Sequence, residues 1–178
     1  GTDDWTGDIA DIELDIADLN VSVRSQYHFL EGMKSYKKEN KQGLDSIISK
    51  IGDDYNRATF IVTNSNAKLC SGVTRDEANQ TDISEAKIRQ LQLMALSANL
   101  KNDILLAEEY FLESISLEKS ISYSYGPPPI QKPTHELYAD WLLTQNRKEE
   151  AFEQYSLTLK AAPKRLLALQ GIEKSNKI

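Results

Sequence analysis

Apolar residues recur every three or four positions along most of the chain, a spacing that predicts amphipathic helices. The pattern is clearest over 84–121, where two helices are predicted on either side of Asn102. It returns over 132–163, where two more flank Asn146. Ser84 is the expected N-cap of the first of these four helices. The pattern thus predicts two helical hairpins in the C-terminal half.

A weaker version of the same pattern covers 20–60. A helix is expected over 21–40, and a second one carries an apolar stripe formed by Leu44, Ile47, Ile48, Ile51 and Tyr55. Asn40 and Gly43 are expected to supply left-handed residues between the two helices. This segment is predicted to be a degenerate hairpin.

Before it, residues 5–19 place Ile9, Ile12, Ile16 and Leu19 at helical spacing, although Ile12, Leu14 and Ile16 also alternate as in a strand. We expect a helix there, because the rest of the chain is predicted to be helical.

Two stretches break the helical pattern. Residues 60–82 are polar and rich in Asn, Ser and Thr, which predicts a long loop, either functional or disordered. Residues 122–131, SYSYGPPPIQ, predict an extended, proline-rich crossing. The prolines would act as a rigid strap over the helices, or as a ligand for a proline-binding domain.

An internal repeat links the two C-terminal hairpins. Asn102, Ala107 and Phe111 recur as Asn146, Ala151 and Tyr155, each 44 residues later. The same offset relates Ala95 to Ala139 and Ile115 to Leu159. An offset of 44 residues is a 34-residue helical unit plus the ten residues of the 122–131 crossing.

These residues resemble the tetratricopeptide repeat. In a unit that starts at Lys132, small residues stand at the eighth and twentieth positions, an aromatic residue at the twenty-fourth and a proline at the thirty-second: Ala139, Ala151, Tyr155 and Pro163. His135, Leu142 and Thr158 depart from the usual pattern. Residues 84–176 also resemble the C-terminal part of a group of uncharacterised bacterial proteins with this repeat.

The resemblance implies an all-α fold, a right-handed superhelix of about three hairpins. It would form a single domain over 1–178, closed by a capping helix over 164–178. A longer chain, of which this domain is the C-terminal part, is a further expectation. In this architecture the first helices of successive units line a concave groove. The implied groove residues are Arg89, Gln92, Leu96, Asn99, Glu136, Asp140 and Leu143.

Family members that hold a peptide carboxylate place Lys and Asn at the fifth and ninth positions of the unit. Here those positions hold Glu136 and Asp140, so that binding mode is not expected. An acidic, partly apolar groove would instead favour a basic or amphipathic helical partner.

The composition argues against several kinds of binding site and catalytic site. A net charge of −6 argues against nucleic acid as the partner, and no apolar run approaches the ~20 residues that span a bilayer. The single cysteine, Cys70, excludes an internal disulfide, and His28 and His135 lack a second metal ligand at helical spacing. We therefore expect no catalytic residue, no metal and no cofactor.

The charge is also uneven. Residues 1–20 carry seven acidic residues and no Lys or Arg, whereas the tail from Lys160 to Lys177 is basic. Opposite charge at the two ends of the chain would favour head-to-tail contacts between copies. Charged residues on solvated helix faces explain the same distribution.

The sequence thus predicts a non-enzymatic scaffold that binds a protein or peptide partner through the concave face. An accessory or regulatory domain of a larger enzyme or envelope machine is the alternative, and an enzyme that uses Cys70 is a third. A soluble protein is expected, cytoplasmic or periplasmic if bacterial. The partner and the oligomeric state stay open.

Overall fold

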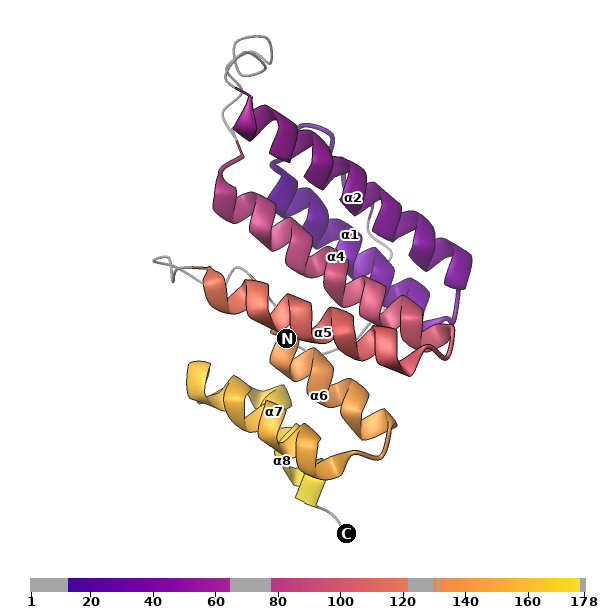
Figure 1. Cartoon of the computed structure of the whole chain (residues 1–178), viewed down its shortest axis with the longest axis vertical. Coiled ribbons are helices and arrows are strands. Elements are labelled where there is room, and N and C mark those ends of the chain that lie inside the picture. The colour runs from indigo at the N-terminus through magenta and orange to yellow at the C-terminus, as the bar shows by residue number, and fades with distance from the viewer. Residues whose placement is uncertain (1–12, 65–77, 122–129, 131, 177–178) are drawn as a thin grey trace. The chain divides into compact units, whose positions relative to one another are not determined.

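The computed structural model of the chain describes residues 13–64, 78–121, 130 and 132–176, and these residues form seven α-helices and no strand (Figure 1). The predicted all-α class is therefore confirmed for the described part. The chain divides into two compact units, Gly1–Tyr123 and Ser124–Ile178. Each unit is described by itself.

Unit 1 contains two helical hairpins. The first is formed by α1 (Val21–Lys37) and α2 (Lys41–Thr63), and the second by α4 (Gln80–Leu100) and α5 (Ile104–Ser120). Helix α4 packs against α1, α2 and α5, so it is the central helix of the unit (Figure 1). Its interior side chains are Ile83, Ala86, Ile88, Leu91, Leu93, Ala95 and Leu96.

Unit 2 contains one hairpin and a closing helix. Helices α6 (Thr134–Thr144) and α7 (Lys148–Ala161) form the hairpin, and α8 (Leu166–Asn176) packs on α7 and, over a smaller area, on α6. The helix that the sequence places after Pro163 is α8.

The three hairpins are closed by the same turn. Each first helix ends in a residue with a left-handed backbone, which is Glu39 (φ 53°), Asn102 (φ 60°) or Asn146 (φ 58°). The next N–H then bonds to the carbonyl oxygen five residues earlier: Asn40 to Ser35 (2.9 Å), Asp103 to Ala98 (3.0 Å) and Arg147 to Leu142 (3.0 Å). This is the Schellman arrangement, which satisfies the carbonyl groups left over at a helix end.

Small or tightly buried residues stand at fixed distances from these turns. Gly32, Ala95 and Ala139 each precede the left-handed residue by seven positions, and all three are buried. A Cβ atom on Gly32 would overlap the side chain of Leu93 in α4. Five positions after the turn stand Leu44, Ala107 and Ala151, which are fully buried. The three hairpins therefore share buried positions at fixed distances from the turn, and a small residue occupies each of them except Leu44.

The first turn differs from expectation in one residue. Glu39, and neither Asn40 nor Gly43, has the left-handed backbone. Asn40 is the N-cap of α2, and its Oδ1 accepts a hydrogen bond from the N–H of Gly43 at 3.0 Å. Asparagine adopts the left-handed region more readily than glutamate, so residue type alone favoured the neighbouring position.

The predicted polar loop over 60–82 is shorter at both ends. Helix α2 continues to Thr63, and α4 begins at Gln80 with Asn79 as its N-cap. Asn79 and Asp82 form a reciprocal capping box, so Ser84 lies inside the helix, where its Oγ donates to the carbonyl of Gln80 at 2.9 Å. The predicted cap at Ser84 is therefore wrong. Residues 65–77, including Cys70, lie outside the described residues.

The helix expected over 5–19 is absent from its described part, 13–19. The Oδ1 of Asp15 accepts a hydrogen bond from the N–H of Ala17 at 3.1 Å, a local bond that competes with helix formation. Residues 5–12 lie outside the described part, as does the 122–131 crossing apart from the buried Ile130.

The left-handed turn gives a test of the fold. Asn102 is exposed, so replacing it changes little packing. Asn102→Val should lower the free energy of unfolding by about 1–2 kcal/mol, because a β-branched side chain resists positive φ, whereas Asn102→Gly should not lower it. Urea denaturation followed by circular dichroism measures both, with Lys38→Val, at the equivalent exposed position before the first turn (φ −87°), as the control. Equal stability of Asn102→Val and Lys38→Val would contradict the turn.

Candidate functional site

The residues predicted to line a groove on α4 are largely covered. Arg89, Gln92 and Leu96 are 2%, 0% and 2% exposed, and Asn99 is half-buried. A side chain that is covered to this extent offers no surface to a partner. The first three residues therefore belong to the interior of the described structure, which is a correction to their predicted place on an open groove.

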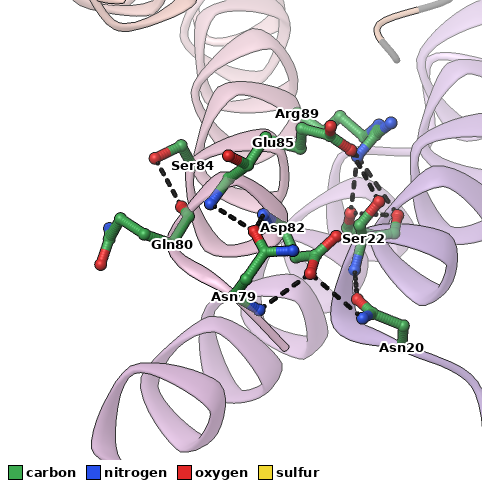
Figure 2. A network of polar contacts seen from close by, with 10 residues as sticks. Asn20, Ser22, Asn79, Gln80, Asp82, Ser84, Glu85 and Arg89 are labelled. Carbon is green, nitrogen blue, oxygen red and sulfur yellow. Dashed lines mark hydrogen bonds and ion pairs between the residues drawn. The ribbon is translucent and has the colours of Figure 1, made fainter. Parts of the chain in front are cut away.

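A row of polar contacts explains why polar residues occupy the interior of unit 1. We call it the α1–α4 polar seam, and it comprises Asn20, Ser22, Ser25, Asp82, Glu85 and Arg89. All of these except Ser25 are labelled in Figure 2. At its start, the Nδ2 of Asn20 donates to Asp82 Oδ2 at 3.2 Å, and the Oγ of Ser22 donates to Glu85 Oε2 at 2.6 Å. The N-terminal ends of α1 and α4 are thus joined.

Arg89 is the charge at the centre of the seam. Its Nη1 donates to Ser25 Oγ at 3.1 Å and to the carbonyl of Ser22 at 3.2 Å, and it lies 3.6 Å from Glu85 Oε2. Burial lowers the pKa of Arg89, and the nearby Glu85 offsets part of that effect. A buried guanidinium is tolerated only when hydrogen bonds and an opposite charge surround it. The seam therefore fixes how α1 lies on α4.

The other end of α4 is also tied to the first hairpin. Asn99 Nδ2 donates to the hydroxyl of Tyr36 at 3.0 Å, and Ser97 Oγ donates to Asp45 at 2.6 Å. Lys101 adds an exposed ion pair to Asp45 at 2.9 Å. The bond from Ser97, followed by that from Lys101, lowers the pKa of Asp45. Asn99, a predicted groove residue, thus has a structural contact as well.

In unit 2 the predicted groove carboxylates form an internal ionic cluster. Glu136 is fully buried, and Arg165 donates to both of its oxygens, with Nη2 2.9 Å from Oε1. Lys132 Nζ lies 3.1 Å from Glu136 and 2.7 Å from Asp140. Asp140 also accepts a hydrogen bond from the hydroxyl of Tyr155 at 2.6 Å. Two cations therefore compensate two carboxylates.

This pairing corrects the expected electrostatics of the groove. The charges of Glu136 and Asp140 are met by Lys132 and Arg165, so they do not present an acidic surface that would attract a basic partner. The side chain of Asp140 is 43% exposed and Leu143 is half-buried, which leaves these two as the accessible members of the set in unit 2.

One of these contacts had a signal in the sequence. Lys132 stands four residues before Glu136, the spacing of a helical ion pair. Arg165 is 29 residues away from Glu136, and no local pattern pairs them.

Metal-binding side chains do not cluster in the described residues. Those residues contain no group of three or more His, Cys, Asp or Glu side chains that could hold a metal ion. His135 Nδ1 lies 2.6 Å from Gln154 Oε1, and His28 stacks edge-on against Tyr27, so the two histidines have separate surroundings. Across the same part of the chain, every helix is too short or too polar to pass through a bilayer.

The ionic cluster in unit 2 makes a stability prediction. Glu136→Ala leaves Lys132 and Arg165 without their buried counter-charge and should destabilise unit 2 by about 3–5 kcal/mol. Asp140→Ala removes a partly exposed side chain and should lower the free energy of unfolding by about 1 kcal/mol. Thermal and urea denaturation of the full chain measure both variants. A loss for Glu136→Ala no larger than that for Asp140→Ala would show that Glu136 is not the centre of the cluster.

Comparison of the chain with protein families, with curated proteins and with solved structures finds no match.

Proposed function

We propose that the chain is a helical-repeat scaffold of the tetratricopeptide type, without catalytic activity, that binds a protein partner through the first helices of its hairpins. The observation that carries the proposal is the common turn. The same left-handed residue and the same bond to a carbonyl five residues earlier recur at Glu39, Asn102 and Asn146. Repetition of one helical unit builds extended binding surfaces in repeat proteins.

The order of packing within unit 1 supports the same proposal. Helix α4, the first helix of the second hairpin, lies against both helices of the preceding hairpin and against its own partner α5. In unit 2, α8 likewise follows α7 and packs on both helices of that hairpin. A solenoid grows in this way, with each new helix covering the hairpin before it.

The proposed binding surface is smaller than the sequence predicts. Arg89, Gln92, Leu96 and Glu136 are buried, so contact with a partner falls to Asn99 in unit 1 and to Asp140 and Leu143 in unit 2. These side chains include an amide, a carboxylate that is already paired with Lys132, and an aliphatic group. In each unit the accessible side chains are therefore mixed or nearly neutral, which suits a partner held by apolar contact and hydrogen bonds.

Site-specific photocrosslinking in cells of the source organism tests this function. A photoreactive residue at Asn99 or at Leu143 should give one discrete protein adduct, because both positions lie on first helices. The same residue at Glu109 or Glu149, exposed on second helices, is the matched control and should give none. Circular dichroism checks that each variant folds. Adducts that are absent from the first helices, or equal at all four positions, would refute the proposed surface.

A further inference from the structure

The closing helix of unit 2 turns its small residues inward and two of its four large apolar residues outward. Ala168, Gly171 and Ser175 form the buried face of α8, and a Cβ atom on Gly171 would overlap the ring of Tyr155. Leu166 and Leu169 are 62% and 43% exposed and lie on one face of the helix, three residues apart. Helices that close a repeat stack usually have a polar outer face, so this face is suited to a contact.

Lysines flank these leucines in the sequence. Lys160, Lys164 and Lys174 are exposed, and Glu173, four residues after Leu169 on the same helical face, is the one exposed acid over 160–176. Arg165 is engaged with the buried Glu136. We call Leu166, Leu169 and these three lysines the α8 face. The exposed side chains over 160–176 thus carry a net positive charge, which favours a bound segment that is both apolar and acidic.

Residues 13–19 have that chemistry. Leu14 and Leu19 are 58% and 40% exposed, and Glu13, Asp15 and Asp18 are exposed acids. No Lys or Arg occurs in residues 1–20. We call residues 13–19 the acidic segment.

The acidic segment has a defined shape. The N–H of Leu19 donates to the carbonyl of Ile16 at 3.2 Å, and Asp15 Oδ1 accepts from the N–H of Ala17 at 3.1 Å. Arg24 Nη1 donates to the carbonyl of Ala17 at 3.4 Å and so ties the segment to α1. Its leucines and carboxylates are therefore presented in a turn that α1 supports.

We propose that the acidic segment of one copy of this chain binds the α8 face of a second copy. The exposed leucines of the two surfaces would bury one another, while Glu13, Asp15 and Asp18 face the lysines. Because the two surfaces differ, the contact is heterologous, and each added copy leaves one surface of each kind open. The product is a head-to-tail oligomer. This inference concerns a surface separate from the first-helix surface of the proposed function, so either can fail alone.

Sedimentation velocity of the full chain tests the contact. Wild-type protein should associate as its concentration rises from about 1 to about 500 μM, and salt should weaken association because the charges lie at the surface. Leu166→Ser with Leu169→Ser should weaken it by about tenfold or more, since apolar burial is lost. Both leucines are exposed, so the double variant should keep its fold, which circular dichroism verifies.

A charge swap identifies the two surfaces. The E13K/D18K variant makes the acidic segment positive, and the K164E/K174E variant makes the α8 face negative. Each variant alone should stay monomeric. A 1:1 mixture should associate again in alternating order, because the altered segment pairs with the altered α8 face and the unaltered segment pairs with the unaltered face. A K41E/K50E variant, altered at exposed lysines of α2, is the control and should associate like wild type.

Two results would overturn the proposal. Wild-type protein that is monomeric at every concentration shows that the surfaces do not bind between copies. Association that persists in both E13K/D18K and K164E/K174E shows that other surfaces are responsible. Loss of association in each variant alone, with association restored in the 1:1 mixture, establishes the contact.

Discussion

The structure depends on one backbone constraint, a left-handed residue at the end of each first helix. With a positive φ at this position, the following N–H reaches the carbonyl five residues back, and the chain reverses into the second helix. Because the reversal is the same at Glu39, Asn102 and Asn146, residues at fixed distances from it meet in equivalent ways. The small residues Gly32, Ala95 and Ala139 owe their buried contacts to this geometry. Because the turn repeats, the packing of the two helices that it joins repeats as well.

Burial of charge is the second feature that organises the chain. Arg89 in unit 1 and Glu136 in unit 2 are interior charges, and each is surrounded by hydrogen bonds from a neighbouring helix or loop. Replacing such a pair with apolar groups often leaves stability unchanged or raises it, so its value lies in orientation more than in stability. The seam sets the position of α1 on α4, and the cluster ties the start of α8 to α6. The buried polar residues on a first helix thus hold neighbouring helices together and are not primarily contacts for a partner.

The hairpins could be predicted because their signals are local. Apolar spacing, the asparagines at 102 and 146, and alanines at matching distances all lie within one hairpin. The residues that cap the helices were harder to predict. Asn79 with Asp82 carried a visible capping pattern, whereas Glu39 had the wrong residue type for its backbone. The groove was least predictable, because exposure depends on neighbours distant in sequence. Ser22 and Ser25 cover Arg89 from more than sixty residues away, and Arg165 reaches Glu136 from 29 residues away.

Hydrogen exchange at three backbone amides tests the central claim of a repeated hairpin most directly. The N–H groups of Asn40, Asp103 and Arg147 each donate to a carbonyl five residues earlier, at 2.9, 3.0 and 3.0 Å. NMR-detected exchange in the full chain should show all three to be protected, because each closes a folded hairpin. Exchange at the rate of an unfolded chain at any of the three would mean that this hairpin lacks the common turn, and would contradict the repeat.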